Sequence, residues 1–419
     1  MTDLSSLDRA AAHALIHSSP ALPAFGVELV SALLDRDEDD AALVLGRWVR
    51  EGIAIENEPG RYAIRESAAN VSAERRTAAE VELRLLVLMA VLADLARDPD
   101  TPRFSAEYEI PVSSPFASPG EAMLWFESNR PALRDLVDVL FDTSRYRPCA
   151  MLAEALLGLC GHGGYLQDQV DIANKALQAL GRSRFSGGFH ADGADGAARA
   201  RDRDQAVATI NLVLASAWCT WGGVPTALQA IDHAEEHVRK LGGGRLRADV
   251  HRCRANVHLA AGNLETAESE ALVSLGLADD TQDGMALYLG QWSLGRIRAA
   301  QGRHHEARDE LDKAADGASK LGHAIPYARV LTDVSASMIA SGEPEDAIRV
   351  LTTAERALTQ ADAGSPAYLA DVDRNMARAW RAAGDPTRAE TYFHQAIGRY
   401  RLARRYRLAE DVEAEWAQR

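Results

Sequence analysis

A glycine that recurs at a nearly constant interval constrains the fold of this chain more than any other sequence feature. The interval is 40, 40, 40 and 42 residues, an alanine follows each glycine after five positions, and a second small residue follows seven positions later. The glycines are Gly222, Gly262, Gly302, Gly342 and Gly384; the alanines are Ala227, Ala267, Ala307, Ala347 and Ala389; the further small residues are Ala234, Ser274, Ala314, Ala354 and Ala396. Self-similarity at such a period is typical of an α-helical solenoid. Each unit is therefore expected to be a helix, a glycine turn and a second helix.

The unit around Gly302 indicates the kind of solenoid. It runs from Trp292 through Leu294-Gly295 and the Gly302 turn to Ala307, and this pattern resembles a tetratricopeptide repeat. A period of 40 residues is longer than the usual one and predicts helices longer by about one turn. Residues 204–419 are therefore predicted to form five repeats in a right-handed superhelix that ends in a C-terminal capping helix.

The segments before this array have weaker patterns. Residues 119–203 predict a helical segment with a degenerate first repeat, whose turn lies at Gly163-Gly164. The stretch 181–204, at the end of this segment, is rich in Gly, Ala and Arg and lacks helical periodicity. It predicts a loop between repeats. Residues 67–118 predict a connecting helix followed by a Pro- and Ser-rich linker.

Residues 1–66 have a pattern of their own. Three short helical segments precede residues 53–64, which alternate apolar and polar side chains around Pro59-Gly60, as a β-hairpin does. Three helices followed by a hairpin predict a winged-helix module. Such a module suggests DNA binding as one possible function. The module holds six arginines against twelve acidic residues, and the acids that begin its third helix repel phosphates. DNA binding through backbone contacts of Arg47, Arg50 and Arg61 is therefore an alternative that the charge disfavours.

Two local segments carry a resemblance to a known family. They are the hairpin Pro59-Gly-Arg-Tyr62-Ala-Ile64 and the segment Trp125-Phe126-Glu127 with Asn129 and Leu133. In this order, and followed by repeats, they resemble the C-terminal half of bacterial STAND regulators (signal-transduction NTPases with numerous domains), especially actinomycete antibiotic-regulatory proteins. The resemblance implies a regulatory role, and in that family an NTPase module precedes the winged helix and a His-Asp pair after the hairpin senses nucleotide. Here Arg65 and Glu66 stand at those two positions and no lysine follows a glycine, so neither the sensor pair nor a GxxxxGK[ST] loop is present.

Composition and motifs argue against several other classes. The net charge of −15 disfavours bulk attraction to nucleic acid or to an anionic membrane. The four cysteines lack any CxxC spacing, and His233 and His237 have no third ligand fixed by sequence, so no metal site is predicted. No apolar stretch is long enough to span a bilayer, no signal peptide is recognised, and no motif anchors a catalytic arrangement. A cytoplasmic, non-enzymatic protein without a cofactor is therefore expected.

The first helix of each repeat is expected to line the concave face of the superhelix. Its inward positions are Leu212, Ser216, Cys219, Arg252, Asn256, Leu259, Trp292, Arg296, Ala299, Thr332, Ala336, Ile339, Arg374, Arg378 and Arg381. The predicted partner groove consists of Arg252, Asn256, Trp292, Arg296, Arg374, Arg378 and Arg381. Guanidinium groups suit carboxylates and an aromatic ring suits an apolar side chain. The predicted partner is therefore an acidic peptide or protein segment.

These patterns predict a non-enzymatic regulatory or adaptor protein of transcription or signalling that binds a peptide or protein in its groove. One alternative is a DNA-binding transcriptional regulator that acts through the winged helix and senses an effector with its repeats. Another is a detached sensor subunit that docks on a separate STAND-type NTPase.

Overall fold

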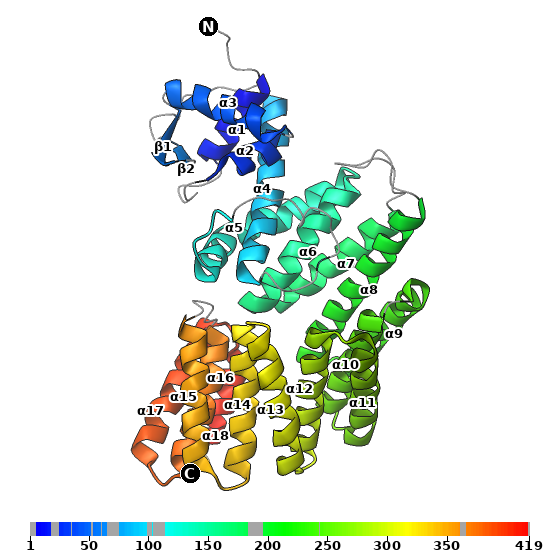
Figure 1. Cartoon of the computed structure of the whole chain (residues 1–419), viewed down its shortest axis with the longest axis vertical. Coiled ribbons are helices and arrows are strands. Elements are labelled where there is room, and N and C mark those ends of the chain that lie inside the picture. Colours follow the sequence, from blue (N-terminus) through cyan, green and yellow to red (C-terminus); the bar gives the residue numbers. More distant parts are fainter. Residues whose placement is uncertain are drawn as a thin grey trace. The chain divides into compact units, whose positions relative to one another are not determined.

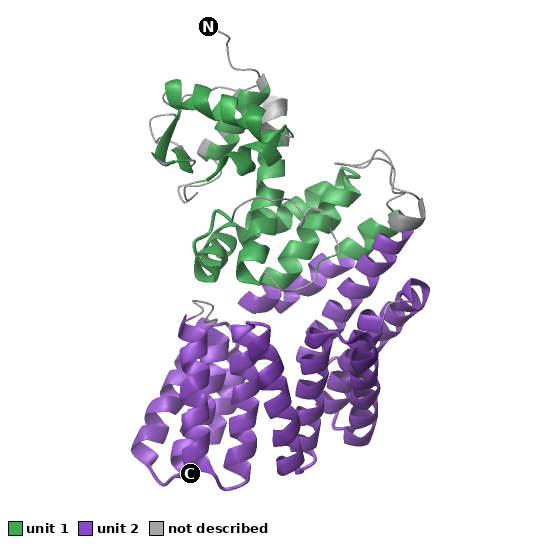
Figure 2. Ribbon diagram, viewed as in Figure 1, with its two compact units in different colours: residues 1–159, 175–186 green, residues 160–174, 187–419 purple. Residues whose placement is uncertain are grey.

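Helices joined by short turns make up most of the computed structural model, and its two strands form a hairpin (Figure 1). The described residues are 6–17, 25–34, 36–51, 53–59, 61–64, 75–98, 103, 114–182, 196–242, 244–360 and 366–417. They fall into two compact units, residues 1–159 with 175–186 and residues 160–174 with 187–419 (Figure 2). Most of the predicted linker before Pro119 lies outside the described residues.

The first unit begins with three helices and the hairpin. Its elements are α1 (Ser6–His17), α2 (Val27–Leu34), α3 (Glu38–Arg50), β1 (Ala54–Glu58), β2 (Arg61–Ile64), α4 (Arg75–Arg97) and α5 (Pro119–Asp142), followed by parts of α6 (Tyr146–Gly163) and α7 (Leu166–Arg182). The antiparallel strands pair Ala54 with Ile64, and Phe25 forms an additional bridge to Tyr62. The predicted order of three helices and a hairpin is therefore present, while its assignment as a winged helix stays a prediction.

The start of α3 shows how the sequence sets this unit. The side chain of Asp37 accepts a hydrogen bond from the backbone N–H of Asp40 at 2.8 Å, which satisfies one of the free donors at the helix start. Behind this cap, Ala41, Val44, Leu45 and Trp48 are buried. The acids at the start of α3 thus stabilise the helix through its dipole.

The second unit is built from consecutive helix pairs. Its helices are α8 (Gly196–Thr220), α9 (Val224–Leu241), α10 (Gly244–Ala260), α11 (Leu264–Thr281), α12 (Gly284–Ala300), α13 (His304–Lys320), α14 (Ala324–Ala340), α15 (Pro344–Gln360), α16 (Pro366–Ala382), α17 (Pro386–Leu402) and α18 (Tyr406–Ala417). Each helix contacts the next one, and α18 follows the fifth pair as a single helix. This arrangement of stacked helix pairs is that of a tetratricopeptide-like solenoid, as the glycine period predicts.

The repeated glycines end the first helix of each pair. Gly302 has a φ of 78°, and the other four repeat glycines also have positive φ, a conformation that a residue without Cβ adopts readily. After Gly302, the N–H of Arg303 bonds back to the carbonyl of Arg298 at 2.9 Å, which closes a Schellman turn. The same hydrogen bond recurs after each of the other four repeat glycines. All five turns therefore have the same backbone geometry.

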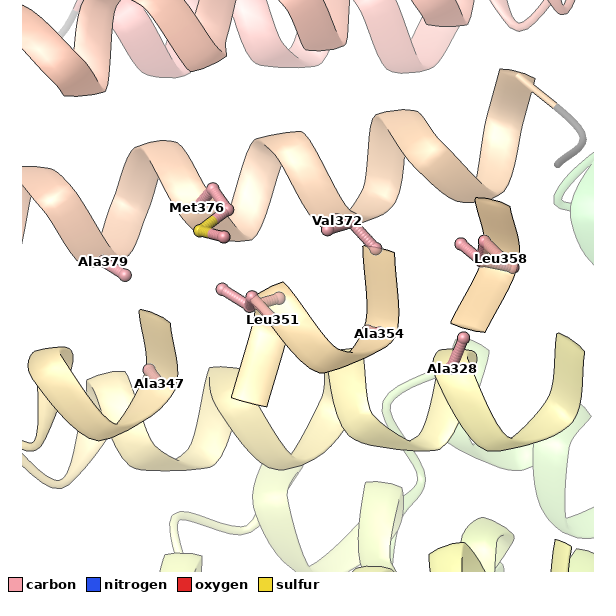
Figure 3. Close-up of a cluster of buried hydrophobic side chains, with 8 residues drawn as sticks. All are labelled: Ala328, Ala347, Leu351, Ala354, Leu358, Val372, Met376 and Ala379. Atoms are coloured by element: carbon pink, nitrogen blue, oxygen red, sulfur yellow. The ribbon is translucent and has the colours of Figure 1, made fainter. Parts of the chain in front are cut away.

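The repeated small residues lie where helices meet. All five alanines that follow the glycines are fully buried, and so are the five small residues seven positions later, none being more than 1% exposed. Figure 3 shows Ala347 and Ala354 of α15 in one cluster with Leu351 and Leu358, between side chains of α14 and α16. Small residues at these positions allow the helix axes to approach closely.

One predicted loop is partly wrong. The stretch 181–204 was expected to be irregular, but α7 continues to Arg182 and α8 begins at Gly196. Its helical part is rich in Ala and Arg, which favour helix without an apolar period. Asp204 of α8 faces the next helix, because its carboxylate lies 2.6 Å from Nδ1 of His237 on α9.

Candidate functional site

The first helices of the pairs share one face of the second unit. Contacts join α8 to α10, α10 to α12, α12 to α14 and α14 to α16, whereas the second helices make no comparable contacts with one another among the described elements. Closer spacing on one side of a stack gives a solenoid its concave surface. We call the exposed side of α8, α10, α12, α14 and α16 the first-helix face.

At the centre of this face, two predicted residues meet on one carboxylate. The indole Nε1 of Trp292 donates to Oδ2 of Asp333 at 2.7 Å, and Nε of Arg296 lies 3.8 Å from the same oxygen. The predicted Asn256 accepts a hydrogen bond from the Ser293 hydroxyl at 3.0 Å. Contacts between α10, α12 and α14 thus hold these side chains in place, and Asp333 balances the charge of Arg296.

Arg252, the first predicted groove arginine, has a partner on its own helix. Its Nη2 lies 2.7 Å from Oδ1 of Asp249. Burial alone would lower the pKa of Arg252, but the charges of Asp249 and of the neighbouring Cys253, together with the hydrogen bond to Asp249, raise that pKa. Arg252 therefore forms a local ion pair rather than a free cation.

The three C-terminal groove arginines converge on Glu415 of α18. The carboxylate oxygens of Glu415 lie 2.8 Å from Nη2 of Arg374, 2.8 Å from Nη2 of Arg378 and 3.6 Å from Nη2 of Arg381. Burial alone would raise the pKa of Glu415, but hydrogen bonds and charge from Arg378 and Arg374 hold it below its ordinary value. These three arginines therefore lie together, and the last helix of the chain already supplies an acid to them.

The last helix is thus held on the array partly by this cluster and partly by apolar contacts. The ring of Trp416 lies 5.0 Å from that of Phe393 on α17, and Val412 and Ala409 are buried. Arg399 and Arg401 in the last turn of α17 pair with Asp373 of α16 and Glu413 of α18. These contacts hold α18 against the end of the array, and its role as a capping helix stays a prediction.

Sequence reasoning missed Asp333, Glu415 and Arg329. The two acids are separated from their arginine partners by 34 to 41 residues in the chain, so no local pattern announces them. Arg329 lies three residues before the predicted inward position Thr332, and the i, i+3 relation on a helix could have placed it on the same face.

The arginines predicted to contact DNA differ from one another. Nη2 of Arg47 lies 3.5 Å from the carboxylate of Asp8, which is only 1% exposed and also pairs with Arg36. Arg50 is exposed at the end of α3, and Arg61 at the start of β2 is half-buried. Arg47 therefore contributes to the interior of the module.

The described residues give no sign of a metal centre or a membrane span. No three His, Cys, Asp or Glu side chains among them gather as metal ligands would. Nor does any helix in the described ranges combine the length and apolarity that a bilayer crossing requires.

Comparison with protein-family models and with curated proteins gives no match. Among solved structures, the chain is similar to a Rap protein complexed with Competence and Sporulation Factor, with 11% identity over 93% of this chain and 94% of that chain and a TM-score of 0.49. It is also similar to a STAND protein with a tetratricopeptide repeat sensor from Pyrococcus horikoshii, with 14% identity over 99% of this chain and 63% of that chain and a TM-score of 0.43.

A third similar structure is BtubC from P. vanneervenii, with 16% identity over 59% of this chain and 92% of that chain and a TM-score of 0.44. Tetratricopeptide-like repeat proteins thus recur among the similar structures. At these identities and TM-scores, no ligand or activity passes from them to this chain.

Proposed function

We propose that this chain is a non-enzymatic adaptor or regulator, of transcription or signalling, that binds a peptide or protein segment on its first-helix face. The observation that supports this role is the face itself, on which consecutive helices bring together half-exposed aromatic, arginine and amide side chains. Trp292, Arg296 and Asn256 lie on α12 and α10 within one network of contacts. Aromatic and arginine side chains dominate the energetics of protein interfaces.

The partner of such a face is an extended or helical segment rather than a small molecule. Side chains of the network come from α10, α12 and α14, so a ligand that contacts all of them must span neighbouring repeats. A chain segment can do this with a few anchoring side chains. We place the anchoring contacts at Trp292 and Arg296.

Site-specific photocrosslinking of the full-length chain in its host tests this role. A benzoylphenylalanine replaces Arg296, whose side chain is 46% exposed, or Leu272 on the second helix α11, which is 48% exposed. We expect a discrete protein or peptide adduct from position 296 and none from position 272. Adducts of equal yield at both positions, or at position 272 alone, would refute a partner on the first-helix face.

The DNA-binding alternative has less support, because Arg47 is held by Asp8 and the module carries an excess of acids. A gel shift with genomic fragments at physiological salt separates the two functions. A sequence-specific shift that an Arg50→Gln substitution abolishes would favour the DNA-binding regulator.

A further inference from the structure

Arg329 differs from every arginine that the sequence places in the groove. It lies on α14 and is exposed. Its guanidinium carbon is 4.8 Å from the ring centroid of Trp292 on α12 and 5.1 Å from that of Tyr368 on α16. Both distances lie within the cation–π range of about 6 Å. Three consecutive first helices therefore contribute one side chain each to a Trp292–Arg329–Tyr368 cluster.

The charge of Arg329 is also left without a direct acidic partner. Within the described part of the chain, no carboxylate comes within ion-pair distance of Arg329 and no hydrogen bond to it is formed. By contrast, Arg252 pairs with Asp249 and Arg296 faces Asp333. Arg374, Arg378 and Arg381 share the single carboxylate of Glu415. Arg329 is thus an exposed cation of this face that no described carboxylate approaches to ion-pair distance.

The carboxylates of Asp333 on α14 and Asp371 on α16 each have another hydrogen-bond partner. Asp333 accepts from the indole of Trp292 and faces Arg296, and Asp371 accepts a hydrogen bond from the hydroxyl of Tyr400. Burial raises the pKa of Asp371, although the charges of Arg329 and Arg374 oppose that rise. Neither acid therefore saturates Arg329.

A guanidinium held between two rings is prepared for one kind of ligand. Its N–H groups lie in the plane of the group and form a fork that matches the two oxygens of a carboxylate. Contact with Trp292 and Tyr368 restricts the side chain before any ligand arrives, which lowers the entropy lost on binding. Both rings are half-exposed, although the ring of Tyr368 also meets that of His162 at 5.7 Å between centroids, so part of each ring is open to a neighbouring side chain.

We propose that the Trp292–Arg329–Tyr368 cluster is a carboxylate-binding site, which takes a Glu or Asp side chain of a peptide whose neighbouring residue packs on the rings. This assignment rests on the proposed peptide-binding role and moves acid recognition from the predicted arginines to Arg329. Because the whole protein carries a charge of −15, a preference for an acidic peptide must come from such a local site.

The experiment compares fluorescein-labelled hexaglutamate and hexaglutamine by fluorescence anisotropy with the full-length protein. We expect the wild type to prefer hexaglutamate and Arg329→Gln to weaken its binding about tenfold or more, as the loss of a charge-assisted bidentate contact implies. Arg329→Lys keeps the charge but not the fork and should fall between the two. Arg349→Gln removes the same charge from the 78% exposed Arg349 of α15 and should change binding less than threefold, about the effect of one distant charge.

Equal losses in Arg329→Gln and Arg349→Gln, no loss in Arg329→Gln, or no preference of the wild type for hexaglutamate would each overturn the assignment. Unchanged thermal unfolding of Arg329→Gln shows that its fold is intact. Crosslinking at position 296 separates this result from the broader role. If adducts persist there while Arg329→Gln binds hexaglutamate normally, the carboxylate site falls and the partner role stands.

Discussion

Replacing one glycine of α12 with alanine tests the close helix packing that holds the first-helix face. A Cβ at Gly295 would lie 2.7 Å from Cγ of Leu311 and 3.1 Å from the carbonyl oxygen of Ala307, both on α13. Leu311 is fully buried, so it has little room to move. Gly276 of α11 is a matched control, because it is also helical and no atom lies within 4 Å of an added Cβ.

Both substitutions gain the helix propensity of alanine, but Gly276 is exposed whereas the buried Gly295 faces side chains of α13. Alanine gains about 1 kcal/mol over glycine in a helix interior, so Gly276→Ala should stabilise the protein by about that amount. Overpacking a filled site costs about 1–3 kcal/mol, which offsets or exceeds the same gain at Gly295. We therefore expect Gly295→Ala to be less stable than Gly276→Ala by about 1–3 kcal/mol.

Urea unfolding followed by circular dichroism measures the difference in midpoint, and hydrogen exchange localises it. Faster exchange in α12 and α13 should accompany Gly295→Ala, because repeats interact mainly with their neighbours. Equal midpoints for the two variants would show that α12 and α13 do not approach as closely as described. Since α12 carries Trp292 and Arg296, looser packing there should also weaken partner binding.

Two further outcomes follow from buried charges. Burial, opposed by Arg399 and reinforced by Glu355, raises the pKa of Asp373 to about 7 from its ordinary 3.8, so the fold favours the neutral acid. That contribution to stability is present below pH 4 and is lost as the pH rises through 7, up to about 4 kcal/mol. Asp373→Asn should therefore raise the melting temperature at pH 8 much more than at pH 4, unlike the exposed Asp316→Asn, and an equal rise at both pH values would contradict it. Separately, Glu415→Gln should speed hydrogen exchange throughout α18, since it leaves three arginines facing one another and removing one partner of a part-buried pair costs a few kcal/mol. Glu410→Gln on the same helix is the control, and equal exchange in both variants would argue against the cluster.

The solenoid could be predicted because its determinants are local. Gly302 needs a positive φ and Ala307 needs a buried site, and both needs recur with the helix pair. The hairpin at residues 54–64 was likewise predictable from a period-two pattern around a turn. By contrast, the helical residues 196–204 were not predicted, because this Ala- and Arg-rich stretch lacks the periodic apolar residues by which a helix is recognised in a sequence.

The state of the predicted site could be foreseen only in part. The repeat register placed Trp292 near Arg296 and Arg374 near Arg378 and Arg381, and the structure also has each of these sets sharing one carboxylate. It could not reveal Glu415, because that contact depends on how α18 packs against α16. The inward positions were assigned by the repeat period, and Arg329 was not among them. It nevertheless lies on the same helix face as Thr332, because residues three apart on a helix are neighbours.

Internal acids change what the arginines of this face can do for a partner. An acidic peptide that reaches Arg374 and Arg378 must compete with Glu415, which already holds both guanidinium groups at 2.8 Å. Exchanging one carboxylate for another leaves the number of ion pairs unchanged, so little affinity is gained there. At Arg329 the same peptide forms a pair that did not exist before. We therefore expect any selectivity for acidic partners to concentrate on Arg329, and the cluster at α18 to act chiefly on the stability of the end of the array.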